Sequence, residues 1–331
     1  MGGNAETVTG WVKCTLCPKE CELGPGDRGN CRARVNIDGK LLTLVYGKPC
    51  AVHIDPIEKK PMFHFLPGTS IFSIATAGCN LHCKFCQNWD ISQKDPEDTE
   101  NGDLPPDKVV QAARYSVCNS IAYTYSEPMI FFEYTRDASS IARQAGLKNI
   151  LVTAGYISEK PLRELCKVTD GANLDIKAFS DDYYRNVCDG DLATVLKTFE
   201  VMKEEGVFLE ITNLIVPTLN DDPGMIRDLC RWLVKNGGPD VPLHFSRFFP
   251  MYLMRNLYPT PQKTLETAKD IAKEEGLHFV YVGNVPGVDE DTNCPNCGAV
   301  LISRVGYSVT ANKLVDGHCP DCNAVIAGVW K

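Results

Sequence analysis

The sequence lacks an excess of positive charge, a long apolar run and an export signal. Its 34 lysine and arginine residues are outnumbered by 42 aspartate and glutamate residues, and the formal net charge is −8. This balance counts against DNA or RNA as a partner. No stretch reaches the roughly 18 apolar residues of a membrane span, and the start, MGGNAETVTGWVKC, has no basic region followed by an apolar segment. We therefore expect a cytoplasmic protein with no membrane partner.

Cysteine, in contrast, is abundant, with 16 in 331 residues. In a reducing compartment, thiols spaced as C-x2-C are metal ligands more often than disulfides. Most of the cysteines form three clusters: Cys14, Cys17, Cys21 and Cys31; Cys79, Cys83 and Cys86; and Cys294, Cys297, Cys319 and Cys322. The others lie in apolar or helical patterns and are expected to be small buried residues: Cys50, Cys118, Cys166, Cys188 and Cys230.

Between the second and third clusters, short β-rich runs alternate with helical patterns. The predicted strands are 71–76, 120–125, 149–153, 172–178, 208–216, 243–249 and 279–283. The predicted helices are 105–117, 129–146, 158–168, 191–206, 224–238 and 261–276. A repeated strand and helix predicts an α/β fold of parallel strands, closed as a barrel or open as a doubly wound sheet. The chain divides into a cysteine-rich segment (1–68), this α/β region (69–288) and a four-cysteine module (289–331).

In both architectures the functional residues gather where parallel strands end. The second cysteine cluster follows the first predicted strand. Polar residues stand at the ends of the other strands: Ser126, Glu127, Thr153, Asp175, Lys177, Thr212, Asn213, Arg247 and Asn284. Together they predict one rim that carries both signs of charge and faces the three thiols.

The stretch AGCNLHCKFCQN spaces Cys79, Cys83 and Cys86 as C-x3-C-x2-C. Thiolates are the ligands of iron–sulfur clusters, and three of them leave one iron of a [4Fe–4S] cluster without a protein ligand. An open metal position is typical of a site that binds a substrate or cofactor, whereas structural sites are closed. The spacing therefore predicts a catalytic iron–sulfur site.

At these residues the sequence resembles the radical S-adenosylmethionine (SAM) superfamily, whose signature is C-x3-C-x2-C after the first strand of a partial (β/α)6 barrel. The position after IFSIATAG and the aromatic Phe85 before Cys86 strengthen the resemblance. It implies that the open iron binds S-adenosyl-L-methionine. One electron would then cleave the cofactor to methionine and a 5′-deoxyadenosyl radical, which abstracts hydrogen from a substrate. Cys79, Cys83 and Cys86 would be the catalytic metal ligands.

Further cofactor-binding residues are implied by the same resemblance. YSEP is similar to the family's glycine–glycine–glutamate motif, so Glu127, beside Ser126, would accept the amino group of the methionine moiety. LDIKAF looks like the D-x-K motif of the pyruvate formate-lyase activating enzyme group, which places Asp175 and Lys177 near the cofactor. Thr153, in TAG, matches that group's T-N-G position.

The sequence also departs from the family pattern. Both glycines of the glutamate motif are replaced in YSEP, and Val152 stands where the group has an aspartate before the threonine. The group's histidine on the sixth strand is absent at the equivalent place, where SRFFP offers Arg247 and Phe249. We include Arg247 among the cofactor-binding candidates.

A closer resemblance covers nearly the whole chain. It is carried by CTLCPKECELGPGDRGNC, DPIEKKPMFHFLPG, GCNLHCKFCQNWDISQ, YTYSEP, VGNVPG and CPNCG with CPDC, which look like the AmmeMemoRadiSam system radical enzymes. This resemblance implies AMMECR1-like and Memo-like proteins as partners, with a low-potential reductant such as flavodoxin or ferredoxin, and it supplies no substrate. Activation of a glycyl radical enzyme is the alternative role.

The two terminal clusters are open to more than one metal. CPNC and CPDC resemble the knuckles of a zinc ribbon; we favour zinc over a single rubredoxin-type iron because GYSVTANKLVDG, between them, predicts a plain hairpin. The first cluster, C-x2-C-x3-C-x9-C, suits structural zinc or an auxiliary iron–sulfur cluster equally.

The segment HIDPIEKKPMFHFLPG precedes the first predicted strand. We expect His53 and His64 to be hydrogen-bonding residues. The charged residues Asp55, Glu58, Lys59 and Lys60 are expected to face solvent rather than the substrate entrance. Asn88 and Trp89 are expected to pack against the cluster.

Two other classes of function compete with this interpretation. In a non-catalytic zinc-ribbon or iron–sulfur adaptor all three clusters would be structural, and the acidic charge and the barrel-sized middle region count against it. An electron carrier without radical chemistry would need a fourth ligand at the central cluster.

Overall fold

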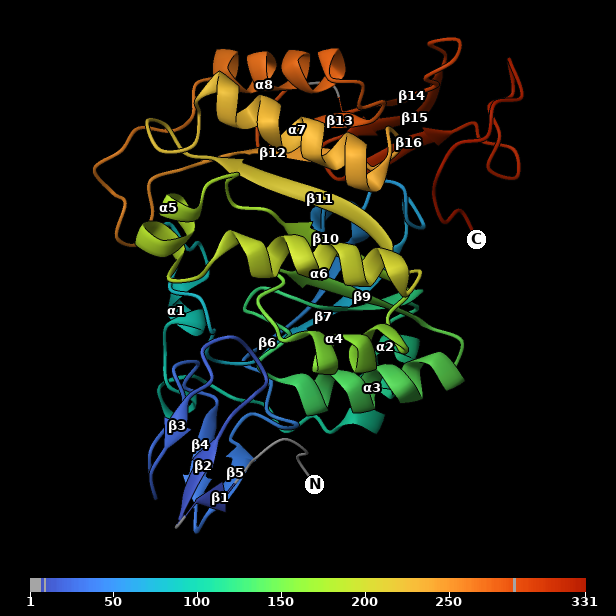
Figure 1. The fold of residues 1–331 in the computed structure, drawn as a ribbon. Coiled ribbons are helices and arrows are strands. Elements are labelled where there is room, and N and C mark those ends of the chain that lie inside the picture. Colours follow the sequence, from blue (N-terminus) through green and yellow to red (C-terminus); the bar gives the residue numbers. More distant parts are fainter. Residues whose placement is uncertain (1–6, 9, 288–289) are drawn as a thin grey trace.

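An eight-stranded sheet dominates the computed structural model, which describes residues 7–8, 10–287 and 290–331 (Figure 1). The strand order is β13-β12-β11-β10-β9-β8-β7-β6, in which β7 to β13 are parallel and β6 is antiparallel to β7. The strands are β6 (Ala51–Pro56), β7 (Ser70–Ala75), β8 (Ser120–Tyr123), β9 (Lys148–Thr153), β10 (Gly171–Asp175), β11 (Phe208–Ile215), β12 (Leu243–Arg247) and β13 (Val280–Gly283).

Helices connect the parallel strands, and Figure 1 shows α3, α4, α6 and α7 side by side along one face of the sheet. The helices are α1 (Trp89–Ser92), α2 (Pro106–Tyr115), α3 (Phe132–Gln144), α4 (Glu159–Cys166), α5 (Asp181–Tyr183), α6 (Leu192–Glu204), α7 (Pro223–Gly237) and α8 (Gln262–Glu274), with short turns η1 (Ile57–Lys59), η2 (Pro96–Asp98) and the π-helical η3 (Tyr184–Cys188). Asp191 and Asp222 cap α6 and α7 by accepting main-chain N–H bonds. No helix in the described ranges is long and apolar enough to span a bilayer.

The predicted α/β fold, with parallel strands joined by helices, is confirmed. The edge strands β6 and β13 do not pair with each other in the described residues, so the sheet is open. β6 was not predicted, and most of its side chains are exposed or half-buried. Val52 and Ile54 alternate with polar residues, but these apolar side chains are exposed and the polar Asp55 is buried, which is the reverse of the pattern expected for a strand with one buried apolar face.

The cysteine-rich N-terminal segment forms two small sheets at one end of the molecule (Figure 1). Its strands are β1 (Thr7–Val8), β2 (Trp11–Lys13), β3 (Glu22–Leu23), β4 (Arg34–Ile37) and β5 (Lys40–Thr43). The Arg34 guanidinium, at the start of β4, binds both carboxylate oxygens of Glu133 on α3 at 3.0 and 2.7 Å. This two-point ion pair fixes the segment to the helical face of the main sheet.

The C-terminal module is a three-stranded sheet of β14 (Thr292–Asn293), β15 (Val300–Val305) and β16 (Ser308–Asn312). Arg304 on β15 is buried and donates to the carbonyl oxygen of Phe63 at 2.8 Å and to the Thr292 hydroxyl at 2.8 Å. Because an unsatisfied buried guanidinium is costly, these bonds fix the module against the segment before β7.

His64 belongs to the same contact. Its side chain is fully buried, with Nδ1 2.7 Å from the Ala327 carbonyl oxygen and Nε2 2.7 Å from the Tyr281 hydroxyl. The prediction that His64 is a hydrogen-bonding residue is confirmed. Burial lowers its pKa to about 4.

This pKa makes folding sensitive to acid. The unfolded chain binds a proton at His64 near pH 6.5, whereas the folded chain does so only near pH 4, so stability is complete above pH 6.5 and falls as the pH drops toward 4. We expect His64 to remove about 2 kcal/mol of the free energy of unfolding between pH 7 and pH 5.

Urea titrations at the two pH values measure this loss, and His64→Gln should lack the His64 part of it. His278→Gln, at an exposed histidine, is the matched control and should keep the wild-type pH dependence. Equal pH dependence in wild type and His64→Gln contradicts the prediction.

Candidate active site

A cavity of about 410 Å³ opens at the carboxyl ends of the parallel strands. The strand register brings these ends together, since Leu174 pairs with Thr153 and Asp175 with Thr212. Most of the predicted rim residues line the cavity: Ser126, Glu127, Thr153, Asp175, Lys177, Thr212 and Asn284.

Two predicted rim residues are not among those that line the cavity. The buried side-chain amide of Asn213 donates to the Ile176 carbonyl oxygen at 2.8 Å. The guanidinium of Arg247 donates to the Thr260 carbonyl oxygen at 2.8 Å and lies 5.1 Å from the centre of the Phe249 ring. These contacts hold the loops behind the rim.

The three thiols of the loop after β7 face this cavity. Cys79, Cys83 and Cys86 are the cysteines among its lining residues. The Leu81 N–H donates to the Cys79 sulfur at 3.4 Å, and the Ser92 hydroxyl lies 3.2 Å from the Cys86 sulfur. Hydrogen bonds to sulfur favour the thiolate form that binds iron. Three thiols on one wall therefore fit a cluster that keeps one iron open to the cavity.

The turn that starts this loop requires glycine. Gly78 has a φ of 93°, and a Cβ atom at this position would collide with the carbonyl oxygen of Cys31. Both the backbone conformation and the close approach exclude a larger residue. The N-terminal cysteine segment thus packs directly against the loop that presents the three thiols.

Cys188 on η3 is buried as predicted, like Cys118, Cys166 and Cys230, but it also contacts the central cysteine loop. A hydrogen bond from its thiol lowers the pKa of Cys83, against the effect of burial. The His82 N–H also donates to the Cys188 carbonyl oxygen at 2.8 Å. Cys188 is not among the residues that line the cavity. It therefore supports Cys83 from behind.

Cys50, the fifth of these cysteines, is only half-buried and its thiol donates to the Ala75 carbonyl oxygen at 3.7 Å.

Glu127 is the most buried acid on the rim, with 2% of its surface exposed. Its Oε1 accepts a bond from the Thr153 hydroxyl at 2.5 Å, and its Oε2 accepts the Ala154 N–H at 2.8 Å. Burial raises the pKa of Glu127 to about 7, although these bonds oppose the rise. These bonds fix the orientation of the Glu127 carboxylate, and a cation that enters the cavity would stabilise its charged form.

Asp175 and Lys177 both line the cavity and form an ion pair with each other. Burial disfavours the charge on Lys177, but the Asp175 carboxylate and the Cys83 thiol raise its pKa above the usual value. Lys177 is therefore a cation whose charge acts on Cys83 and Cys86. It offsets negative charge that the thiols acquire when they bind metal.

Tyr125 stands where the radical SAM motif described above has a glycine, and its backbone adopts a conformation that glycine favours. Its φ is 61°, a region that non-glycine residues enter at a cost of about 1 kcal/mol or more. The Asn88 side chain donates to its carbonyl oxygen at 2.8 Å, and its hydroxyl donates to Asp55 at 2.5 Å. The strained backbone is thus held by contacts on both sides.

The predicted solvent-facing charges before β7 are mostly buried, so that expectation was wrong. Asp55, Glu58 and Lys60 are 5%, 1% and 2% exposed, and only Lys59 is well exposed. Lys60 Nζ lies 2.7 Å from Asp55 Oδ2 and 4.0 Å from the centre of the Tyr125 ring. Burial lowers the pKa of Lys60 to about 8. Glu58, Lys59 and Lys60 line the cavity and give this wall its charge.

His244, which was not among the residues predicted from the sequence, lines the cavity from β12. Its Nε2 lies 2.7 Å from the buried carboxylate of Glu210 on β11, and its ring stacks on Tyr281 with centroids 5.0 Å apart. Ser246, two residues later on the same face of β12, also lines the cavity. The alternation of polar residues along the strand was the available signal.

The C-terminal module closes part of the opening, because Glu290 and Tyr307 line the cavity. Asn88 lines it as well, whereas the Trp89 ring stacks on Tyr252, with centroids 5.3 Å apart. No sequence pattern linked the module to the site, since nothing in the spacing predicts where a separate hairpin docks.

The C-terminal cysteines form the tightest group of potential metal ligands. The sulfur atoms of Cys294, Cys297, Cys319 and Cys322 all lie within 4.8 Å of one another, with pairs at 3.5 and 3.7 Å. A tetrahedral ion with bonds of about 2.3 Å holds its sulfur ligands roughly 3.8 Å apart. The group fits one metal ion, and the geometry suits zinc and iron equally. A hairpin of β15 and β16 does lie between the knuckles, but the predicted stretch 306–317 contains only its turn and β16, because β15 precedes that stretch.

Comparisons with known proteins find similar sequences and a similar fold. A sequence profile of the Radical SAM superfamily matches residues 73–233. The chain is 46% identical over 294 residues to an uncharacterized protein of Methanocaldococcus jannaschii, covering 88% of this chain and 87% of that protein. It is 27% identical over 161 residues to the pyruvate formate-lyase-activating enzyme of Clostridium pasteurianum, covering 48% of this chain and 67% of that protein.

Among solved structures, a radical SAM methyltransferase from Sphaerobacter thermophilus matches with a TM-score of 0.53 and 15% sequence identity. The match covers 66% of this chain and 67% of that chain. At this identity the likeness concerns the fold alone.

The Asp55 ion pair allows a test of the cavity wall. Asp55→Asn leaves the Lys60 ammonium buried without a carboxylate, and we expect it to lower the free energy of unfolding by about 3–5 kcal/mol. Urea unfolding measures the change. Lys59→Met removes the exposed partner of the same carboxylate and should cost less than about 1 kcal/mol. If both variants lose the same free energy of unfolding, the buried Lys60–Asp55 pair is worth no more than the exposed Lys59–Asp55 pair, and the prediction is wrong.

Proposed function

The chain belongs to the radical SAM superfamily, and on that premise we propose that it is an enzyme that uses a [4Fe–4S] cluster and S-adenosylmethionine in the cavity at the carboxyl ends of β7 to β13. The observation that carries the proposal is that three thiols face this cavity beside a buried carboxylate, with no fourth thiol among the described residues that line it. Cys79, Cys83 and Cys86 would hold the cluster. When bound, it supplies the electron that cleaves S-adenosylmethionine to methionine and a 5′-deoxyadenosyl radical, which takes hydrogen from the substrate.

The residues around the cluster position the cofactor. Glu127 would accept hydrogen bonds from the amino group of the methionine moiety, and the Thr153 hydroxyl and the Ala154 N–H hold the carboxylate in place for this contact. The Lys177 cation stabilises the thiolate charge at Cys83. Ser126, whose hydroxyl donates to the Thr76 carbonyl oxygen at 2.7 Å, fixes the loop that carries Glu127.

The remaining walls would receive the substrate. Lys60 and His244 line the cavity, and both are held by buried carboxylates. Tyr307 of the C-terminal module narrows the opening, which limits the access of water to a reactive radical.

The partial similarity to a pyruvate formate-lyase-activating enzyme supports a second candidate function, the activation of a glycyl radical enzyme. In that case the substrate is a glycine in a partner protein rather than a small molecule. The partial barrel, the zinc in the C-terminal module, a flavodoxin or ferredoxin as electron donor, and the AMMECR1-like and Memo-like partners stay predictions from the sequence.

Cleavage of the cofactor tests the proposal directly. Reduced, reconstituted protein should convert S-adenosylmethionine to 5′-deoxyadenosine, quantified by liquid chromatography. Cys83→Ala removes one of three ligands and should reduce the product to background. Cys166→Ala, at a buried cysteine on α4, is the matched control and should retain activity. Wild-type cleavage by Cys83→Ala rules out the assignment.

A second test concerns Glu127. Glu127→Gln keeps the shape of the side chain but loses the charge that pairs with the cofactor's amino group, so we expect S-adenosylmethionine to bind about 10 to 100 times more weakly. Anaerobic equilibrium binding measures the affinity. Glu164→Gln, at a half-exposed acid on α4, should bind as wild type does. Unchanged affinity in Glu127→Gln contradicts this contact.

A further inference from the structure

The N-terminal cysteines form a second site that the proposed function does not use. Cys14 and Cys31 are buried, whereas Cys17 and Cys21 are half-buried, and none of the four forms a disulfide. The chain folds back on itself here, since the Cys14 N–H donates to the Cys21 carbonyl oxygen at 2.9 Å. Residues far apart in this segment thus bring their thiols toward one place.

Each of the four sulfur atoms accepts a main-chain N–H bond. The N–H of Leu16 donates to Cys14, that of Lys19 to Cys17 and that of Ala33 to Cys31. The Asn30 N–H donates to the Cys21 sulfur at 3.4 Å. A neutral thiol is a weak acceptor, so four such bonds in one segment indicate sites built for thiolates.

At Cys14, Cys17 and Cys31 the N–H donor belongs to the residue two positions after the cysteine. The same arrangement occurs at Cys79 and Cys86 in the central loop, and at Cys297 and Cys322 in the C-terminal module. The N-terminal group therefore has the local geometry of the metal-ligand groups.

The spread of the sulfur atoms distinguishes one ion from a cluster. Within the described residues, the C-terminal quartet is the only group of three or more cysteine, histidine or acidic residues whose ligand atoms all lie within 4.8 Å of one another. The N-terminal quartet is more widely spread, as is the central trio. A cluster of four irons needs wider spacing than one ion, because each thiolate binds a different iron.

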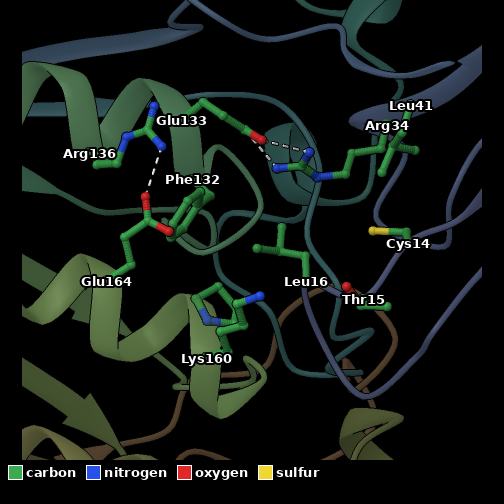
Figure 2. Close-up of a pocket in the computed structure, with 11 residues that line it drawn as sticks. Cys14, Thr15, Leu16, Arg34, Leu41, Phe132, Glu133, Arg136, Lys160 and Glu164 are labelled. Carbon is green, nitrogen blue, oxygen red and sulfur yellow. Dashed lines mark hydrogen bonds and ion pairs between the residues drawn. The ribbon is translucent and has the colours of Figure 1, made fainter. Parts of the chain in front are cut away.

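A buried cation lies beside the N-terminal site. Figure 2 shows Cys14 next to Arg34 in the wall of a cavity of about 360 Å³, with the guanidinium directed to Glu133. Arg34 is itself buried, and a buried cation beside thiolates offsets part of their negative charge.

We propose that Cys14, Cys17, Cys21 and Cys31 bind a second [4Fe–4S] cluster, with one thiolate on each iron. With no open iron, this site is closed to substrate. It adjoins the central loop, because the Asn80 side chain bonds the Cys17 sulfur and also donates to the Tyr156 carbonyl oxygen at 2.6 Å. The close contact of Gly78 with Cys31 joins the two sites on the other side.

Metal and sulfide analysis of the anaerobically reconstituted full chain tests the proposal. Wild type should hold about eight irons and about eight sulfides in clusters. Cys17→Ser/Cys21→Ser, at the two half-buried positions, should lose about half of each, and Cys118→Ser should lose none. Loss of one zinc with no change in iron overturns the proposal.

The Cys17→Ser/Cys21→Ser variant could be lost to misfolding, so a variant at the central site provides a second test. Cys83→Ala retains the N-terminal site and should keep about four irons, seen by Mössbauer spectroscopy as a [4Fe–4S] cluster whose spectrum S-adenosylmethionine does not change. Cys83→Ala protein without any cluster overturns the second site. If instead wild type and Cys83→Ala both hold about four irons, the N-terminal site stands and the proposed central site fails.

Discussion

The fold depends on one constraint: three thiols must face a single cavity while the loop that carries them is buried on its other side. Gly78 makes this possible by allowing the Cys31 carbonyl to approach the loop more closely than any side chain would permit. Cys188 and the Cys188 carbonyl support Cys83 and His82 from η3. The loop is thus held by the N-terminal segment and by the connection after β10, and its sulfur atoms are left exposed to the cavity.

Charge within the cavity is organised in pairs, because an isolated ion in a buried wall is costly. Lys177 pairs with Asp175, Lys60 with Asp55 and His244 with Glu210. Glu127 is the exception, since its partners are a hydroxyl and N–H groups rather than a cation. A buried acid in the cavity that forms no ion pair with a side chain in the described residues is the natural place for a positively charged group of a ligand.

Replacement of the family's glycine by Tyr125 links this site to the segment before β7. The side chain that takes the glycine's place bonds Asp55 and covers the Lys60 ammonium, at the cost of an uncommon backbone conformation. Because β6 pairs with β7, the same segment is fixed to the edge of the sheet. The replacement of the family's glycine by Tyr125 thus accompanies the burial of Asp55 and Lys60, two charged residues that were predicted to face solvent.

The sequence by itself determined the alternation of strands and helices and the thiol spacing, because both are local: apolar periodicity and a turn of eight residues need no distant partner. It also located Glu127, Asp175 and Lys177, since parallel strands end at a common edge. Only the tertiary structure decided that β6 joins the sheet, that Lys60 and Asp55 are buried, that Cys188 supports Cys83, and that the C-terminal module reaches the cavity. These features depend on contacts between residues far apart in the chain, whose burial and pairing no local pattern encodes.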